Sequence, residues 1–278
     1  MWVAMGSLSS FALAIVSAAI PSRYFNKTDY GTYRQILYVY NTLLIIFSAG
    51  LPSVFAYFLP RYSAEQGKDI VIKVTKVLLI AGGVFSLFLF LTADIIASLL
   101  KNPELSRGLR IFSPIPLLLL PTLGIDGIFS TYKKTIYIAI YNTVSRSLML
   151  LFIVLPVILF KGTYIHAIYG WLVVSVLMLI IALYYKNIPF RGLVRQGSSL
   201  TLKEVFGYSL PLVGASLWGM AIRSADQFYI SRYFGTEVFA EFSNGFIELP
   251  FVGMVTGATS VVLMPLFSKL IHENTNGN

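Results

Sequence analysis

Residues 77–100 read VLLIAGGVFSLFLFLTADIIASLL, and this stretch decides the fold class. Its only ionisable side chain is that of Asp94. A helix must run through roughly 20 predominantly apolar residues to cross the hydrocarbon core of a bilayer. The stretch meets that requirement with a few residues to spare, so it predicts a membrane-spanning helix.

The rest of the chain has the same apolar character. Its 278 residues are 56% hydrophobic and only 12% charged, whereas soluble domains carry about 25% charged residues. Polar side chains are too few to cover a globule in water. The composition therefore predicts an all-α, polytopic membrane protein, with room for about eight spans of roughly 20 residues each and their loops.

Seven further apolar segments lie before and after residues 77–100, which form the third segment in chain order. We predict spans at residues 2–20, 35–59, 111–130, 136–160, 164–185, 205–234 and 239–267. Segment 2–20 lacks the basic start of a secretory signal peptide, so we interpret it as a retained helix. Segment 111–130 contains Pro114, Pro116 and Pro121. Because proline removes backbone hydrogen bonds, this segment is predicted to be bent or broken.

The segments are separated by polar links of very different length. We expect a polar link at 21–33, a charged loop at 61–76, a turn at 101–110, short turns at 133–134 and 161–162, and a long link at 186–204. The run from Lys68 to Lys76 fits contact with anionic lipid. A polar tail closes the chain.

The residue inventory excludes several kinds of chemistry. The chain has no cysteine and two histidines, His166 and His272, which excludes disulfides and thiolate sites and nearly excludes a histidine metal centre. No paired-carboxylate, nucleophile–base or glycine-rich phosphate motif occurs. We therefore expect a protein that is not an enzyme, with no catalytic residue, metal or cofactor.

The positive charge points to membrane topology. The net charge is +9, but the basic residues are dispersed through the links, which argues against a nucleic-acid partner. The even-numbered links carry slightly more of them, namely Arg61, Lys68, Lys73, Lys76, Lys133, Lys134, Lys186, Arg191, Arg195 and Lys203. Positive residues favour the cytoplasmic side, so both termini are expected there.

The chain contains an internal repeat. Ser22-Arg23-Tyr24-Phe25 recurs as Ser231-Arg232-Tyr233-Phe234, and Tyr30-Gly31-Thr32-Tyr33 corresponds to Phe239-Ala240-Glu241-Phe242. Both matches have an offset of 209 residues. The first two segments thus resemble the seventh and eighth, and an interval of six helices makes the repeats parallel.

The repeat divides the chain into parts. We expect a six-helix lobe at 1–185, a cytoplasmic link at 186–204, the first two helices of a second lobe at 205–270 and a polar tail at 271–278. Eight helices then amount to one lobe and the beginning of another. We expect a fragment, a truncated gene or helices supplied by another chain.

The motifs resemble those of the polysaccharide transporter family, the Wzx-type flippases of the multidrug/oligosaccharidyl-lipid/polysaccharide exporter superfamily. The resemblance rests on Arg23-Tyr24-Phe25, Asp29-Tyr30-Gly31-Thr32-Tyr33, Gly50-Leu51-Pro52, Pro60-Arg61-Tyr62, Tyr208-Ser209-Leu210-Pro211-Leu212 and the block from Arg223 to Gly235. It implies two lobes of helices around a central cavity. It also implies transport of undecaprenyl-linked oligosaccharides across the bacterial inner membrane for O-antigen, capsule or exopolysaccharide synthesis.

Ionisable groups inside the predicted spans are the candidate site residues, since each costs about 2.5–3.5 kcal/mol to insert. Arg223 and Asp226 lie one helical turn apart in the seventh segment. They either neutralise each other or line a substrate cavity. Arg146 shares a helix face with Asn142, and Ser145 lies beside it. This cluster suits an anionic or hydroxyl-rich ligand; the alternative is a bridge from Arg146 to Asp126.

Two carboxylates are candidates for ion coupling. Glu248 lies two residues before Pro250, where a weakened helix exposes backbone carbonyls and a carboxylate can titrate or hold a cation. Burial as a neutral acid is its alternative. Asp126 is the second candidate, although both Asp126 and Asp94 lie near predicted span ends, where an interfacial position is the simpler interpretation.

Three classes of function remain. The first is a flippase that works by alternating access on lipid-linked oligosaccharide, with membrane lipid and polysaccharide-assembly proteins as further partners. The second is a cation-coupled multidrug exporter or lipid II flippase of the same superfamily. The third is a membrane-embedded glycosyltransferase or polymerase, or a remnant that transports nothing.

Overall fold

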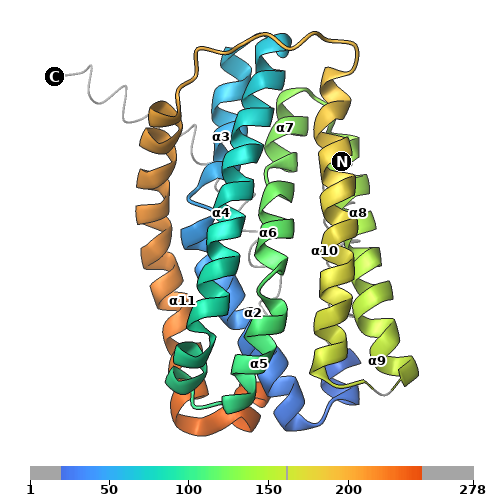
Figure 1. Ribbon diagram of the computed structural model, residues 1–278, viewed down its shortest axis with the longest axis vertical. Coiled ribbons are helices and arrows are strands. Elements are labelled where there is room, and N and C mark those ends of the chain that lie inside the picture. The colour runs from blue at the N-terminus through green and yellow to red at the C-terminus, as the bar shows by residue number, and fades with distance from the viewer. Residues whose placement is uncertain (1–19, 161, 246–278) are drawn as a thin grey trace, which may run out of the picture. The chain divides into compact units, whose positions relative to one another are not determined.

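The computed structural model describes residues 20–160 and 162–245, and every regular element in that part of the chain is helical (Figure 1). In chain order, the elements are α2 (Lys27–Phe47), α3 (Leu51–Phe58), η1 (Leu59–Arg61), α4 (Ala64–Leu99), α5 (Pro103–Phe112), α6 (Ile115–Leu119), η2 (Leu120–Thr122), α7 (Ile125–Thr131), α8 (Thr135–Met149), the π-helical turn η3 (Leu150–Val154), α9 (Leu155–Phe160), α10 (Tyr164–Asn187), η4 (Ile188–Phe190) and α11 (Leu202–Gly245).

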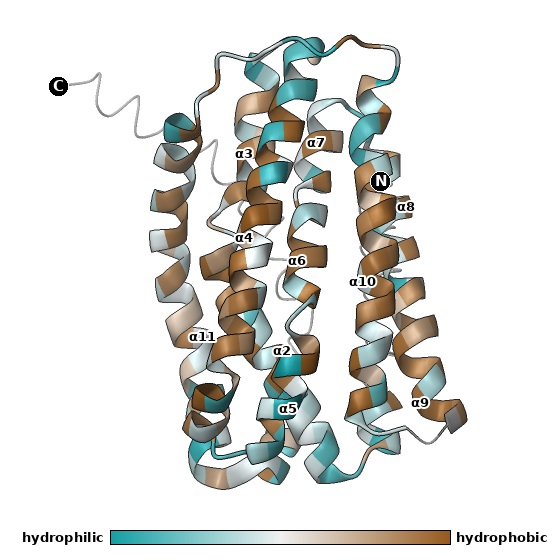
Figure 2. Ribbon diagram, in the orientation of Figure 1, coloured by the Kyte–Doolittle hydropathy of each residue, from teal (hydrophilic) through white to brown (hydrophobic). Residues whose placement is uncertain are grey.

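Within residues 20–160 and 162–245, five helices are long and apolar enough to cross a membrane, or six if the bent pair α2–α3 counts as one span. This agrees with the predicted polytopic all-α class. The predicted span 2–20 and most of 239–267 lie outside the described residues. Figure 2 shows apolar residues along α4 and α10, and exposed side chains such as Leu87, Leu91 and Ile180 leave these helices with a surface suited to lipid.

The predicted charged loop at 61–76 is wrong. Most of it is helical, because Ser63 and Gln66 form a capping box that starts α4 at Ala64. The helix has 36 residues and measures about 54 Å at 1.5 Å per residue. Since the hydrocarbon core is only about 30 Å thick, the charged N-terminal turns extend beyond it.

Two other predicted connections are also helical. The turn predicted at 101–110 is mostly α5, which begins with Pro103 in its first turn, where a missing N–H costs nothing. The link predicted at 21–33 contains the start of α2, capped by the Asn26 side chain, which accepts a 2.7 Å hydrogen bond from the Asp29 N–H. Sequence hydropathy missed both because these turns are polar.

Two predicted spans are interrupted. The segment at 111–130 is broken, as its prolines predicted, into the end of α5, α6, η2 and α7. The segment at 35–59 was predicted as one helix but bends by 46° between α2 and α3. Ala49 and Gly50 adopt positive φ values of 49° and 66° at the bend, a conformation that only glycine adopts easily.

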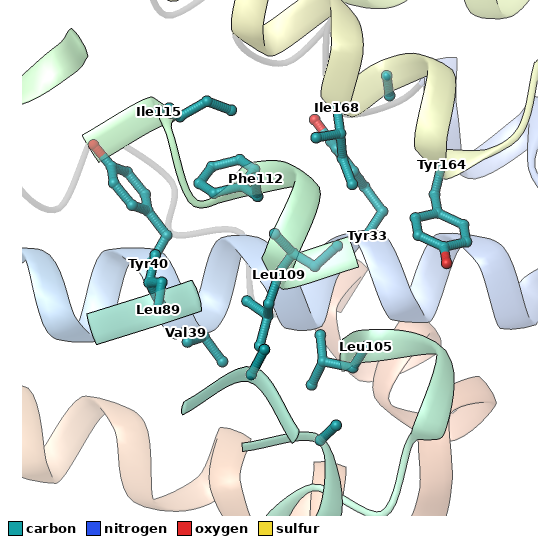
Figure 3. Packing of buried hydrophobic residues seen from close by; sticks show 14 of the residues in the cluster. Tyr33, Val39, Tyr40, Leu89, Leu105, Leu109, Phe112, Ile115, Tyr164 and Ile168 are labelled. Carbon is teal, nitrogen blue, oxygen red and sulfur yellow. The ribbon is translucent and has the colours of Figure 1, made fainter. Parts of the chain in front are cut away.

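The main core packs α2, α4, α5 and α10 together (Figure 3). Tyr40 of α2 stacks on Phe85 of α4 at a centroid distance of 5.8 Å and meets Phe112 of α5 edge-on at 5.4 Å. Such aromatic pairs contribute about 0.5–1.5 kcal/mol beyond the area that they bury. They fix α2 against the broken span, which positions the site described below.

Two adjacent glycines of α4 give a matched test of helix packing. A Cβ at Gly82 would lie 2.8 Å from the Pro116 carbonyl oxygen of α6, whereas one at Gly83 would meet only Leu117 Cδ1 at 3.8 Å. Gly82→Ala should therefore destabilise the protein by about 1–3 kcal/mol through overpacking. Gly83→Ala should be neutral or stabilising by up to about 1 kcal/mol. Thermal unfolding in detergent measures the difference, and equal effects would contradict the close α4–α6 contact.

The long link folds back onto the start of α4. The Asp69 carboxylate, 1% exposed, accepts hydrogen bonds from Arg195 Nε and Nη2 at 2.9 and 2.7 Å and from Ser198 N and Oγ at 2.9 and 2.7 Å. Lys73 Nζ lies 2.8 Å from the same carboxylate, and Lys68 Nζ donates to the Leu193 carbonyl oxygen at 2.9 Å. We call these contacts the link clamp. Two lysines of the run predicted to meet anionic lipid thus hold the link instead.

Helices start at corresponding positions in the two copies of the repeat. The second segment starts as helix α2 at Lys27. Within α11, Gly235 has φ 87° and breaks the helix, so that a new helical stretch starts at Thr236. These two starts are 209 residues apart, which is the offset found in the sequence.

Counterpart residues of the two repeats also touch each other. Thr28 Oγ1 lies 3.0 Å from Glu237 Oε1, and Arg34 Nη2 lies 3.0 Å from the Ser243 carbonyl oxygen; in each pair the separation is 209 residues. The constant offset means that the start of α2 and the stretch after Gly235 run side by side in register, with counterpart positions in contact.

Candidate functional site

The candidate site begins with a pocket between α2, α8, η3 and α10. It encloses about 140 Å³, and its lining includes Arg34 from α2 and Arg146 from α8. The remaining walls are mostly apolar or aromatic and consist of Pro21, Tyr30, Tyr33, Leu37, Met149, Ile153, Val154 and Trp171. We call this the basic pocket.

Helix contacts hold the walls of the basic pocket in place. Trp171 Nε1 donates a 2.9 Å hydrogen bond to the Tyr33 hydroxyl and so joins α10 to α2. A Cβ at Gly170 would lie 2.2 Å from the Phe152 carbonyl oxygen, so only glycine lets α10 approach η3 this closely. Pro156 follows η3 and cannot donate a helical hydrogen bond. The π-helical turn η3 lies in the pocket wall, and π-helical turns within α-helices are frequent at functional sites.

The two arginines of the basic pocket have no acidic partner among the described residues. Arg34 donates to the Ser243 carbonyl oxygen, which is neutral, and the one hydrogen bond of the Arg146 side chain within residues 20–160 and 162–245 runs from Nη1 to Met149 Sδ, at 3.9 Å. The ion pairs found in the described chain involve other residues. The bridge from Arg146 to Asp126, which the sequence left open, is therefore not formed.

A second pocket of about 230 Å³ lies beside the first and shares Met149 with it. Asp126, Asn142 and Ser145 line it, together with Tyr40, Leu119, Thr122, Leu123, Gly124, Ile125, Tyr141 and Met178. We call this the polar pocket, because hydroxyl, amide and carboxylate groups line it. Gly124, at φ 87°, makes the turn that starts α7 and places Asp126 in the first turn of that helix.

The predicted cluster on α8 is therefore divided between two pockets. Asn142 and Ser145 line the polar pocket, and Arg146 lines the basic one. Asp126, predicted from a different segment, joins Asn142 and Ser145. A site with guanidinium groups at one end and hydroxyl and amide groups at the other can bind an anion and an uncharged polar group side by side.

The remaining predicted residues lie elsewhere. Asp226 is exposed on α11, where its Oδ1 accepts a 2.8 Å hydrogen bond from the Gln227 N–H. The backbone of Arg223 belongs to α11, but its side chain lies outside the described part of the chain, as does all of Glu248. Asp94 pairs with Arg110 of α5 at 2.5 Å, which accounts for it structurally.

Sequence reasoning missed Arg34. It falls between the link predicted at 21–33 and the span predicted at 35–59, because the hydropathy of the second span rises only at residue 35. The signal that identifies it is the cap: Asn26 followed three residues later by Asp29 marks a helix start. A helix beginning at Lys27 places Arg34 two turns inside, on the pocket side of α2.

Comparison with known proteins gives the family. Residues 1–271 match the model of a family described as "Polysaccharide biosynthesis protein". The chain belongs to this family. Within this polysaccharide biosynthesis family, the chain is 26% identical over 279 residues to the succinoglycan biosynthesis transport protein ExoT of Rhizobium meliloti (strain 1021).

The match to ExoT is unequal in coverage. It includes 98% of this chain but 53% of the relative, so the chain spans about half the length of the curated relative that it matches. No solved structure matches the chain. The family description names polysaccharide biosynthesis, and the printed name of the relative adds transport for that protein.

Proposed function

We propose that this chain forms part of a transporter that moves undecaprenyl-linked oligosaccharide across the bacterial inner membrane by alternating access. The observation that carries the proposal is the pair Arg34 and Arg146, two guanidinium groups in one pocket of a membrane protein with no carboxylate partner among the described residues. Membership of the polysaccharide biosynthesis family and the name of the relative support it.

The two pockets suit the two ends of such a headgroup. Arginine binds phosphate oxygens with paired, charge-assisted hydrogen bonds, so the basic pocket would hold the diphosphate. The polar pocket, with Asn142, Ser145 and Tyr141, would hold sugar hydroxyls. The polyprenyl tail would stay in the lipid.

Alternating access needs two lobes that move against each other. We propose residues 1–185 as the first lobe, 186–204 as the cytoplasmic link and 205–270 as the first two helices of the second lobe. The contacts between Thr28 and Glu237 support this division, because they join counterpart positions of the repeat. Arg223 and Asp226 would line the cavity from the second lobe, and Glu248 or Asp126 would couple transport to an ion gradient.

The proposed orientation can be tested by cysteine labelling, since the chain has no native cysteine. A Cβ at Gly197 in the link would meet no atom within 4 Å, so Gly197→Cys should be tolerated. A membrane-impermeant maleimide should label it only from the cytoplasmic side. Arg107 is an exposed residue of α5, and Arg107→Cys should be labelled only from the other side. The reverse pattern would invert the orientation.

The transport itself is tested in a strain that lacks the gene. That strain should lose its surface polysaccharide and accumulate lipid-linked oligosaccharide in the cytoplasmic leaflet, and the wild-type gene should restore both. Normal polysaccharide together with increased sensitivity to cationic drugs would instead indicate a multidrug exporter. Loss of the lipid-linked oligosaccharide itself would indicate an enzyme of its synthesis.

A further inference from the structure

A third pocket lies away from the candidate site, between α4 and α10. It encloses about 320 Å³ and is lined by Thr75, Lys76, Lys186, Asn187 and apolar residues, namely Val71, Ile72, Leu79, Pro121, Leu179 and Leu183. We call it the outer crevice. Figure 1 shows α4 and α10 on either side of α6 and α7. Pro121 lies in η2, which connects α6 to α7, and forms part of the crevice wall.

Lys186 is the unusual residue of the outer crevice. Its side chain is 2% exposed, and Nζ donates to the Pro121 carbonyl oxygen at 2.7 Å and to Thr75 Oγ1 at 3.2 Å. Nζ also lies 5.0 Å from the centre of the Phe55 ring. An ammonium group has three donors, so these two neutral acceptors leave one donor without a hydrogen-bond partner among the described residues.

The charge of Lys186 has no counterion within the described chain. The four ion pairs found there involve Lys27, Lys73, Arg110 and Arg195 as cations. Buried charges in proteins are normally paired. Lys76, exposed on α4, lies at the same crevice and adds a second positive charge. The crevice therefore has the polarity of an anion site with apolar walls.

The surroundings point to a lipid as the source of the anion. Leu79 and Leu183 line the crevice and are exposed, and Ile80 and Ile180, near them in the sequence, are exposed too, so α4 and α10 offer apolar surface that suits acyl chains. Lys76 lies 12 residues after the start of α4, about 18 Å along the helix. Because α4 is much longer than the hydrocarbon core is thick, this depth corresponds to the headgroup boundary.

We propose that the outer crevice binds one acidic phospholipid of the neighbouring leaflet, with its phosphate between Lys76 and Lys186 and one acyl chain along Leu79, Leu179 and Leu183. Asn187 supplies a further polar group beside the headgroup. Basic pockets between membrane helices are known to bind acidic headgroups. This site does not depend on the transport that we propose above.

The test is native mass spectrometry of the purified, delipidated protein. Phosphatidylglycerol and phosphatidylcholine with identical acyl chains are added in separate titrations. We expect phosphatidylglycerol to bind at least about tenfold more tightly, and Lys76→Gln and Lys186→Met each to weaken it by about tenfold, the loss of one charge-assisted contact. Lys203→Gln, an exposed lysine outside the crevice, is the matched control and should bind like the wild type.

Three results would overturn the proposal. Equal binding of the two phospholipids would show that the protein does not recognise an anionic headgroup. Unchanged binding by Lys76→Gln would show that the phospholipid does not bind at the outer crevice. Displacement of phosphatidylglycerol by equimolar undecaprenyl phosphate would assign the crevice to the polyprenyl substrate instead. Because Lys76 is exposed, its variant should fold even if Lys186→Met does not.

Discussion

Replacement of Arg146 by alanine should reduce surface polysaccharide by at least about tenfold while the protein remains in the membrane at its normal level. The guanidinium group lines the basic pocket, and its one hydrogen bond to another described residue is a weak sulfur contact at 3.9 Å, so its removal should cost little stability. A hydrogen bond to a charged group contributes about 1.5–3 kcal/mol, which corresponds to roughly 10- to 150-fold. Complementation of a strain lacking the gene measures the loss.

The controls separate binding from folding. Arg107→Ala removes an exposed arginine of α5 outside both pockets and should leave polysaccharide normal. Arg146→Lys keeps the charge but loses the paired geometry, and should restore only part of the activity. Arg34→Ala should resemble Arg146→Ala. Normal amounts of surface polysaccharide in both alanine variants would show that the basic pocket takes no part in transport.

Asp69→Ala should release the link between the proposed lobes. The carboxylate is 1% exposed and receives hydrogen bonds from Arg195 and Ser198 as well as the ion pair with Lys73. Removal of one member of a buried charge network costs about 3–5 kcal/mol. Because Lys73 and Arg195 are partly exposed and can be hydrated, we expect about 2–3 kcal/mol here. Thermal unfolding should show this, and protease should cut residues 191–201 faster.

Asp94→Ala is the matched comparison for the link clamp. Asp94 also pairs with an arginine, Arg110, but both side chains are exposed, at 67% and 49%. Exposed ion pairs contribute only about 0–1 kcal/mol, so this variant should unfold almost like the wild type. If Asp69→Ala and Asp94→Ala had equal effects and left the link equally resistant to protease, the clamp would have no structural role.

The candidate site was predictable only in part. Arg146, Asn142 and Asp126 stood out because ionisable and amide groups are rare inside apolar segments, and the structure places all three at two adjoining pockets. Their grouping was not predictable. Helix periodicity put Arg146 and Asn142 on one face, but the neighbouring walls from α2 and α7 decide which pocket each one enters.

The contacts of the link clamp could not be predicted from the sequence either. The lysines at 68 and 73 were interpreted as a membrane-surface run, because a sequence window cannot detect that the link residues to which they donate lie 125 residues away. The other errors, in the predicted bounds of the links, arose because the first turns of several helices are polar. Hydropathy registers the apolar part of α4 and α5, whereas capping by Ser63 and the early Pro103 decides where these helices begin.

The membrane class, the broken fourth span and the repeat offset of 209 residues can be predicted from the amino-acid sequence alone, because they follow from composition, local backbone chemistry and a comparison of two stretches of the chain. Three other features could not be predicted: Arg34 and Arg146 share a pocket, Lys186 is buried without an acidic partner in the described chain, and Asp69 holds the link. These facts depend on contacts between residues far apart in the chain. The packing of whole helices sets such distances, and no local sequence pattern encodes them.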